Sequence, residues 1–218
     1  MILNLLVSLF LQVLPVGIFN ISGANTASTS NYLSVKSGYV MSYDGISGRA
    51  NWVAWTLVGA NVGSVARSNK FIQDDSFPRS FYVIDESDYK YTGYDRGHLC
   101  NSEDRTASDH LNEETFLMSN MIPQTPELNR GPFKFLEAYC RKLVLKKGQK
   151  LLIYSGGIGA KGRLTSGVPI PQYCWKAIYT PTEEIYVLFP NERTLAKNWN
   201  KYRVTKDRLE KMTGFQFP

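Results

Sequence analysis

The sequence predicts an α+β fold in which a mainly antiparallel central sheet is flanked by helices. Two observations carry this prediction. Short apolar or alternating segments typical of strands occur on both sides of one long segment with helical spacing. Strands and helices also do not alternate regularly along the chain, which favours an α+β arrangement with antiparallel strand pairing.

The length of 218 residues fits one domain with a substantial core. A hydrophobic fraction of 43% excludes disordered and collagen-like classes. The net charge is +6, and all charged residues lie beyond Val35. A basic folded domain favours a polyanionic partner such as nucleic acid. Charge alone is equally compatible with an ordinary soluble basic protein.

The first 19 residues form an uncharged apolar run that Pro15 and Gly17 interrupt. The interruption argues against a stable membrane span, and the run is typical of a signal peptide core, although no Lys or Arg stands near Met1. We therefore expect residues 1–24 to be a signal peptide or an N-terminal apolar segment, and the protein to be secreted or periplasmic. Residues 25–31 form a predicted linker, and residues 32–218 form a single domain.

Two strands and a turn are predicted at the start of this domain. The segment Tyr32–Tyr43 alternates apolar and polar residues, Asp44-Gly45 is typical of a turn, and Asn51–Leu57 follows as a second strand. This pattern predicts a β-hairpin. After it, Phe71–Asp88 is expected to be a loop that leads into a turn at Asp95–His98.

The clearest predicted helix begins near Pro132, where a missing N–H does no harm in the first turn. Apolar residues recur at helical spacing up to Val144, and Lys146-Lys147-Gly148 provides a C-terminal signal. The preceding Thr106–Glu114 is polar and predicts a loop or short helix. The expected elements of the C-terminal part are strands at Leu151–Ser155, Trp175–Thr180 and Ile185–Phe189, and a helix at Thr205–Thr213.

Three cysteines allow at most one disulfide and one free thiol. We expect Cys140 and Cys174 to be the pair. A zinc site is not favoured, because no two cysteines have short metal-ligand spacing. A free Cys100 two residues after His98 leads to the hypothesis that oxidation inhibits the protein.

The segment Tyr94–Arg141 contains both histidines of the chain, together with carboxamides, carboxylates and arginines. Within it, Asp95-Arg96-Gly97-His98 (DRGH) is followed by Thr115–Gln124, Leu128-Asn129-Arg130 and Glu137. This ordered set resembles the DNA/RNA non-specific endonucleases, the ββα-metal (His-Me finger) nucleases. The similarity is greatest to the secreted cyanobacterial sugar-nonspecific nucleases and extends to Serratia-type nuclease and mitochondrial endonuclease G.

The resemblance implies a ββα-metal finger and a sugar-nonspecific endonuclease. Its substrates would be DNA and RNA, single- or double-stranded, which it hydrolyses to 5′-phosphate products. It implies one Mg²⁺ ion as cofactor, with Mn²⁺ as a possible substitute. The sequence identifies no protein inhibitor, and a monomer is favoured over a homodimer.

Hydrolysis of a phosphodiester requires charge neutralisation and deprotonation of water. The resemblance makes His98 the general base, a role that suits an imidazole with an ordinary pKa of ~6.5. Gly97 is expected to permit close approach of the backbone to a ligand. The other histidine, His110, has no such flanking motif and is expected at the surface.

The resemblance also makes Asn129 the direct Mg²⁺ ligand, since hard cations prefer oxygen. Glu137 would hold the metal through water. Arg141 lies one turn after Glu137, so the two can form an i,i+4 pair, and without the resemblance an exposed ion pair would be the better interpretation.

Arg67 and Arg96 match catalytic, phosphate-binding arginines of the family, and Arg141 is a further predicted phosphate ligand, because guanidinium groups bind phosphate oxygens bidentately. Asn120 is expected either to order the site around His98 or to form hydrogen bonds at a strand end. Asp95 would orient the turn rather than take part in chemistry.

Three alternatives compete with this interpretation. The G-x-G-x-x-G pattern at Gly157–Gly162 lacks the helix that dinucleotide binding needs, because prolines follow it. A Cys/His hydrolase leaves Asn129 and the arginines unexplained. The strongest alternative is a non-catalytic nucleic-acid-binding module on the same fold.

Overall fold

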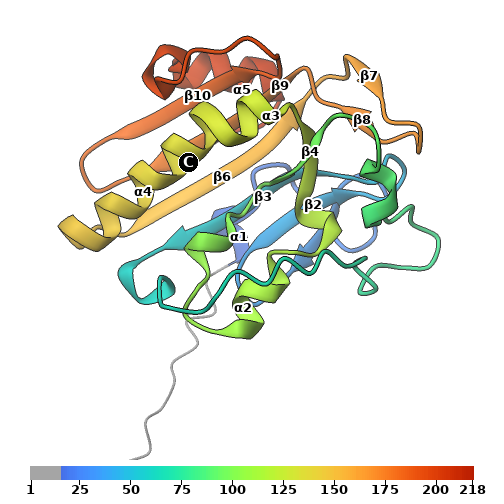
Figure 1. Ribbon diagram of the computed structural model, residues 1–218, viewed down its shortest axis with the longest axis horizontal. Coiled ribbons are helices and arrows are strands. Elements are labelled where there is room, and N and C mark those ends of the chain that lie inside the picture. The colour runs from blue at the N-terminus through green and yellow to red at the C-terminus, as the bar shows by residue number, and fades with distance from the viewer. Residues whose placement is uncertain (1–15) are drawn as a thin grey trace, which may run out of the picture.

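The computed structural model describes residues 16–218, so most of the predicted signal peptide lies outside the described residues. A six-stranded antiparallel sheet in the order β1-β2-β3-β6-β9-β10 forms the centre of the molecule (Figure 1). Its strands are β1 Tyr32–Val35, β2 Val40–Asp44, β3 Arg49–Leu57, β6 Leu151–Ile158, β9 Tyr173–Tyr179 and β10 Glu184–Pro190. The predicted α+β class with a mainly antiparallel sheet is confirmed.

Helices and shorter strands surround this sheet. The helices are α1 Val16–Phe19, α2 Asp109–Glu114, α3 Pro126–Leu128, α4 Lys134–Lys147 and α5 Lys206–Thr213. Two smaller antiparallel pairs are β4 Asp95–His98 with β5 Met121–Gln124, and β7 Gly162–Arg163 with β8 Pro169–Ile170.

The central sheet is buried on both faces because its strands carry apolar side chains at successive positions. Val53 and Trp55 pack in a core that includes Leu136 and Val144 of α4. The intervening residues of β3 face a second core, which includes Leu209 of α5 and residues near the N-terminus. Sequence reasoning finds such strands as apolar runs, and the runs predicted in the C-terminal part correspond to β6, β9 and β10.

Residues before β1 belong to the folded domain, so the boundary predicted at residue 32 is too late. Phe19 and Ile21 are buried in the second core. The hydroxyl of Ser22 accepts a hydrogen bond from Trp52 Nε1 at 2.8 Å. Asn31 also accepts a hydrogen bond from the Ser42 hydroxyl, so residues 25–31 are held against the sheet and are no free linker.

Two predicted element boundaries are wrong for identifiable reasons. Tyr32–Tyr43 is a hairpin of β1 and β2 rather than one strand, because the chain turns where Lys36 N donates to Tyr39 O. The helix predicted from Pro132 begins at Lys134 and continues an irregular turn from α3. Its end is as predicted, with Gly148 in the left-handed conformation at a φ of 62°.

The DRGH residues form a strand, whereas the sequence predicted a turn. Asp95–His98 is β4, which pairs with β5 in the register Gly97 to Ile122 and His98 to Met121. Helix α4 follows this pair, so two strands and a helix surround the candidate site (Figure 1). Among residues 16–218, no helix has the length and apolar character needed to cross a membrane.

Candidate active site

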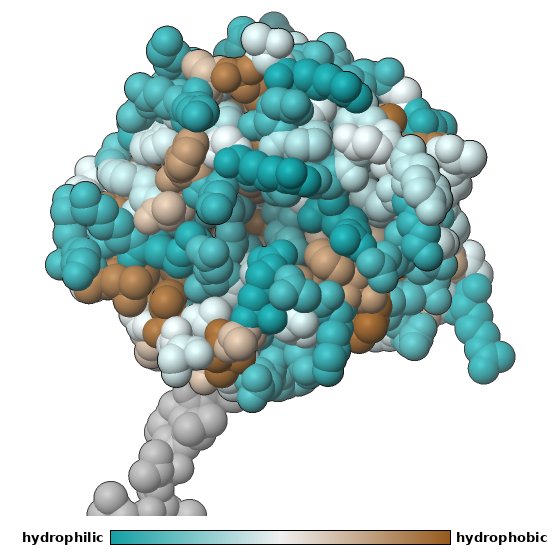
Figure 2. Space-filling view, in the orientation of Figure 1, coloured by the Kyte–Doolittle hydropathy of each residue, from teal (hydrophilic) through white to brown (hydrophobic). Residues whose placement is uncertain are grey.

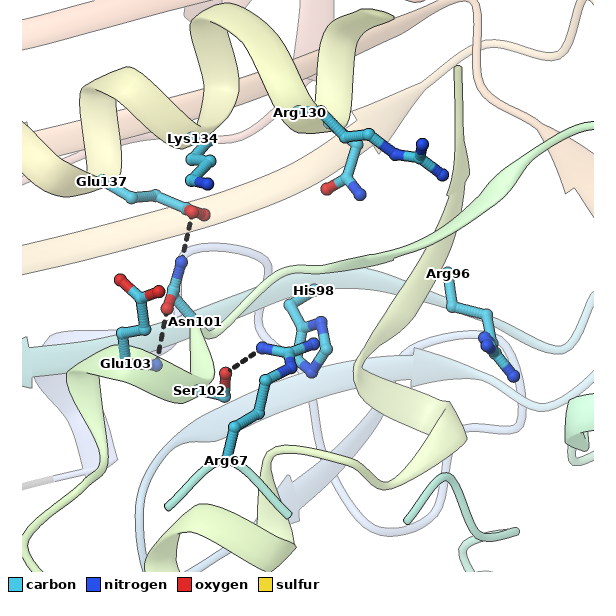
Figure 3. Close-up of a pocket in the computed structure, with 10 residues that line it drawn as sticks. Arg67, Arg96, His98, Asn101, Ser102, Glu103, Arg130, Lys134 and Glu137 are labelled. Carbon is cyan, nitrogen blue, oxygen red and sulfur yellow. Dashed lines mark hydrogen bonds between the residues drawn. The ribbon is translucent and has the colours of Figure 1, made fainter. Parts of the chain in front are cut away.

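A cavity of about 400 Å³ lies between the β4–β5 pair and the first turns of α4 (Figure 3). Hydrophilic residues predominate on the face of the molecule shown in Figure 2. The cavity is lined by Arg67, Arg96, His98, Asn101, Ser102, Glu103, Asn129, Arg130, Lys134 and Glu137. The structure therefore brings five of the predicted site residues together from distant parts of the chain: Arg67, Arg96, His98, Asn129 and Glu137.

His98 is held at the end of β4 by two aromatic rings. The Phe116 ring lies 4.9 Å from the imidazole, edge to face, and the Phe71 ring lies 5.8 Å away. The side chain is 8% exposed, and its Nε2 has no hydrogen-bond partner among the described residues. Burial, and then the positive charges of Arg67, Lys176 and Arg96, hold the pKa of His98 well below its ordinary value. The imidazole is therefore neutral at neutral pH.

The side chain of Gln124 lies where a Cβ at position 97 would stand, so only glycine fits there. This corrects the expectation that Gly97 lets a ligand approach its backbone. A Cβ at this position would lie 2.6 Å from Gln124 Cγ and closer still to the Gln124 amide. Gln124 is fully buried on the paired strand β5. Glycine thus allows the side chain of Gln124 to lie directly against β4.

Asn120 forms hydrogen bonds to the backbone just after His98, so the second of its two predicted roles applies. Its Oδ1 accepts from Cys100 N at 2.9 Å, and its Nδ2 donates to the carbonyls of Cys100 and Thr115 at 2.9 and 2.8 Å. The side chain is fully buried and does not line the cavity. Asn120 therefore fixes the backbone around Cys100 and Thr115 and does not contact the cavity.

Asn129 lies in a break between α3 and α4. The break arises because Gly131 has non-helical angles, with φ −106° and ψ −121°, and Pro132 follows it. The Asn129 Nδ2 donates to Asp95 Oδ2 at 2.9 Å, and Arg130 donates to both oxygens of the same carboxylate. Because Asp95 accepts from the amide nitrogen, the amide oxygen of Asn129 is free to bind a cation.

Glu137 is buried in the first turns of α4 and faces Lys176 from β9. The Lys176 Nζ lies 3.3 Å from Glu137 Oε1 and donates to Leu99 O at 3.1 Å. Asn101 donates to the other carboxylate oxygen. Burial raises the pKa of Glu137, and the charge of Lys176 opposes this effect.

Sequence reasoning missed Lys176 and Asn101. The sequence contained one signal for Lys176, a charged residue inside the apolar strand Tyr173–Tyr179. On a strand, Lys176 shares a face with Ile178, and that face packs toward α4. The Lys176 Nζ lies 4.3 Å from the Phe133 ring centroid and 4.9 Å from that of Trp55, so the buried cation is enclosed by aromatic rings and the Glu137 carboxylate.

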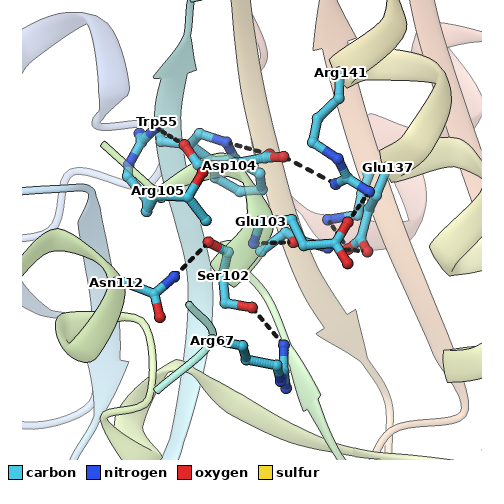
Figure 4. A network of polar contacts seen from close by, with 12 residues as sticks. Trp55, Arg67, Ser102, Glu103, Asp104, Arg105, Asn112, Glu137 and Arg141 are labelled. Carbon is cyan, nitrogen blue, oxygen red and sulfur yellow. Dashed lines mark hydrogen bonds and ion pairs between the residues drawn. The ribbon is translucent and has the colours of Figure 1, made fainter. Parts of the chain in front are cut away.

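Arg141 has different partners from those predicted. It forms ion pairs with Glu103 and, at 3.1 Å, with the buried Asp104, and no direct pair with Glu137 (Figure 4). Asp104 also accepts from Trp55 Nε1 at 3.2 Å. Because Arg141 does not line the cavity, the geometry gives no support for its predicted role as a phosphate ligand.

Arg67 and Arg96 enter the cavity from two sides of His98. Arg67 donates to Ser102 and Asn69, and its guanidinium lies 4.7 Å from the Phe116 ring centroid. Arg96 pairs with Glu86 on the far side. The two arginines therefore lie where they can contact an anion beside the imidazole.

The disulfide prediction is wrong, and the expectation of a free Cys100 is confirmed. Cys100, Cys140 and Cys174 are all free and buried, so the expected bridge between Cys140 and Cys174 is not formed. Burial raises the pKa of the Cys100 thiol to about 12, so it has little thiolate to react with an oxidant. The other histidine, His110, is exposed on α2, as predicted for a surface residue.

The residues around the cavity fit a hydrated hard cation. Asn129 offers a free amide oxygen, and Glu137 offers a carboxylate on the same cavity. Among residues 16–218, no group of three histidine, cysteine or acidic side chains is arranged to hold a metal. A hard cation bound by these oxygens would keep several waters.

This fold and this cavity define a class of protein. The chain belongs to the DNA/RNA non-specific endonuclease family, whose sequence profile matches residues 20–218. Membership confirms the resemblance seen in the sequence. It also confirms, at the level of the family, that the chain is a nuclease.

Individual relatives support the same assignment. A nuclease from Nostoc sp. (strain PCC 7120 / SAG 25.82 / UTEX 2576) is 39% identical over an alignment 214 residues long, which covers 91% of this chain and 78% of the relative. Mitochondrial endonuclease G from Bos taurus is 32% identical over 112 residues, 51% of this chain and 38% of that protein. A chain in the crystal structure of the EndoG/EndoGI complex has a TM-score of 0.74 at 25% identity, covering 85% of this chain and 84% of that one. The likeness to EndoG confirms the ββα-metal fold.

Proposed function

We propose that this protein is a sugar-nonspecific endonuclease that hydrolyses DNA and RNA to 5′-phosphate products, with His98 as the general base and one Mg²⁺ ion as cofactor. One observation carries the proposal. A buried imidazole with a lowered pKa and the free amide oxygen of Asn129 line the same cavity as Arg67 and Arg96. These residues provide a base, a cation ligand and phosphate ligands at one place.

In this mechanism each side chain acts on one part of the phosphodiester. A ring nitrogen of His98 accepts the proton of the attacking water, which neutral imidazole can do because burial keeps it deprotonated. Arg67 and Arg96 hold the non-bridging oxygens and stabilise the charge that builds up at phosphorus. Asn129 would hold Mg²⁺ directly and Glu137 would hold it through water. When bound, Mg²⁺ supplies Lewis-acid stabilisation of the phosphate and leaving oxygen.

Indifference to base sequence and to the sugar follows from the kind of contact. The charged side chains of the cavity suit phosphate oxygens, which are the same in DNA and RNA and carry no base information. Mn²⁺ is expected to substitute for Mg²⁺. We further propose that the protein is exported and monomeric. For the similar EndoG, the EndoG/EndoGI complex describes a mechanism of inhibition.

Digestion of plasmid DNA and of RNA tests this function. With Mg²⁺ both substrates should be degraded, and EDTA should stop the reaction. His98→Ala should lower the rate about 10²- to 10⁴-fold, the usual contribution of a general base. His110→Ala is the matched control, since it removes the exposed histidine and should leave the rate unchanged. A non-catalytic binding module would leave both nucleic acids intact under every condition.

A further inference from the structure

A second cavity of about 490 Å³ adjoins the first. The two share Arg67, Arg96, Asn129 and Arg130 as lining residues. In Figure 3, Glu137 and Lys134 lie on one side of His98, while Arg96 and Arg130 lie on the other. The second cavity therefore extends the site beyond Arg96, away from Glu137.

The loop before β4 forms the rest of this cavity. Its further lining residues are Asn69, Phe71, Glu86, Tyr89, Lys90, Tyr94 and Asp95. The mechanism proposed above uses none of these side chains to contact the reacting phosphate. They combine aromatic rings with charge, a composition that suits nucleic acid.

The charges in the second cavity leave an excess of cations. Its two carboxylates are already paired, Glu86 with Arg96 and Asp95 with Arg130 at 2.7 Å. Lys90 forms no ion pair with any residue in 16–218, and it is exposed. The cavity can therefore accept another anion without displacing an existing partner.

Aromatic rings stand beside these cations. The guanidinium of Arg96 lies 3.9 Å from the Phe71 ring centroid, so this arginine is fixed at the boundary between the two cavities. Tyr94 is partly exposed and precedes β4 directly. Its ring lines the second cavity and packs partly against the buried cluster around Met118 and Met121, with Lys161 Nζ 5.9 Å from the ring centroid.

We infer that the second cavity binds the nucleotide next to the cleaved phosphodiester on the same strand, with Lys90 on its phosphate and Tyr94 against its base. This inference rests on the proposed function, because it assumes that a nucleic acid strand occupies the first cavity. A phosphodiester inside a strand has a nucleotide on each side, so a strand whose phosphate lies beside His98 has one neighbouring nucleotide toward Arg96 and the second cavity. Only the Arg96 side offers both an unpaired lysine and aromatic rings among the lining residues described.

The affinity of a catalytically inactive variant for single-stranded DNA tests the inference. The parent is the full chain with His98→Ala, and the probe is a fluorescein-labelled single-stranded DNA of about twelve nucleotides, within the usual range of site sizes. Into this parent are introduced Lys90→Ala, Tyr94→Ala, Tyr94→Phe and Lys146→Ala. Lys146 is an exposed lysine in the last turn of α4 that lines neither cavity, so it controls for net charge.

Lys90→Ala and Tyr94→Ala should each raise Kd roughly fivefold or more, and Tyr94→Phe should restore the parent value because it keeps the ring. Lys90→Ala should also make the fall of log association constant with log salt concentration less steep, by about one in the slope. Lys146→Ala should change neither. Parent-like Kd and salt slope for Lys90→Ala would overturn the inference even if Tyr94→Ala were unfolded. Tight binding by the parent without cleavage by the native chain would instead overturn the proposed endonuclease activity and leave the cavity as a binding site.

Discussion

At the scale of single residues, the site depends on how burial changes the chemistry of ordinary side chains. His98 is packed between Phe71 and Phe116, near three cations. Both burial and positive charge disfavour the imidazolium, so they act in the same direction. Glu137 differs, because burial raises its pKa while the charge of Lys176 lowers it.

The first prediction concerns pH. His98 must be deprotonated to accept a proton, so kcat/KM should rise with pH through its pKa and then level off. Because this pKa is lowered, the acid limb should lie below pH ~6.5, the ordinary value for histidine. In Glu137→Gln the residual activity should keep this limb, since the variant removes only the carboxylate. An acid limb above pH ~6.5 in both proteins would contradict the account.

Gly97 provides a second prediction. Gly97→Ala should destabilise the protein by about 1–3 kcal/mol, because a Cβ would overlap the buried side chain of Gln124. The double variant Gly97→Ala with Gln124→Ala should recover much of this loss, since the Gln124 amide has no hydrogen-bond partner among the described residues. Urea unfolding of the two variants measures the difference. Equal stability of the single and double variants would show that Gln124 is not the cause.

At the scale of elements, Asp95 connects β4 to the break before α4. One carboxylate accepts hydrogen bonds from Asn129 and from Arg130, which belong to the irregular turn Asn129–Phe133. The turn is not regular helix, because Gly131 has non-helical backbone angles and the side-chain amide of Asn129 donates to Asp95. The break therefore places the Asn129 oxygen at the cavity, and Asp95 sets its orientation.

Asp95→Ala should accordingly weaken cation binding without removing any ligand. Titration with Mn²⁺ by calorimetry should show a lower affinity, about 10-fold or more, as is usual when a partner that orients a metal ligand is lost. Glu127→Ala is a suitable control, because Glu127 is an exposed acid on α3 that does not line the cavity. Unchanged affinity in Asp95→Ala would mean that Asn129 is held by other contacts.

Much of the architecture could be predicted at this scale. The apolar runs of β6, β9 and β10 and the end of α4 at Gly148 were correctly predicted, because local patterns determine them. The strand Asp95–His98 was missed, because its polar residues have no strand pattern and pair only through β5. Lys176 was missed for a similar reason, since its partner Glu137 lies on another element and no local rule joins them.

The candidate site was partly predicted in the same way. Arg67, Arg96, His98, Asn129 and Glu137 were identified by resemblance, and the structure brings them to one cavity. The i,i+4 spacing predicts a pair between Arg141 and Glu137, but Arg141 pairs with the buried carboxylate of Asp104 instead. Such competition between partners depends on tertiary packing, which spacing along a helix cannot show.

At the scale of the whole molecule, the domain includes the residues just after the apolar N-terminal run. Phe19 and Ile21 pack in the same core as Leu209 of α5. The neighbouring Ser22 hydroxyl donates to Asn31 and accepts from Trp52 Nε1. Cleavage after residue 24, where the predicted signal peptide ends, would remove these apolar side chains. An exported form that keeps the core intact would therefore be cleaved before Phe19.

Truncation measures this contribution. A chain that begins at Asn25 should lose about 3–6 kcal/mol relative to one that begins at Val16, because it loses the large buried side chains of Phe19 and Ile21. For a domain of this size the melting temperature should fall by at least roughly 6 °C. Equal melting temperatures of the two chains would show that the N-terminal residues do not stabilise the domain.

The most direct test of the central claim is a Mg²⁺ titration of DNA cleavage by the native chain, His98→Ala and Asn129→Ala. If the imidazole and the amide act on one phosphodiester, His98→Ala should require the native Mg²⁺ concentration but reach a rate about 10²- to 10⁴-fold lower. Asn129→Ala should need a much higher Mg²⁺ concentration for any activity, because the variant lacks the only protein side chain proposed to bind Mg²⁺ directly. Native Mg²⁺ dependence in Asn129→Ala, or a native rate in His98→Ala, would contradict the account.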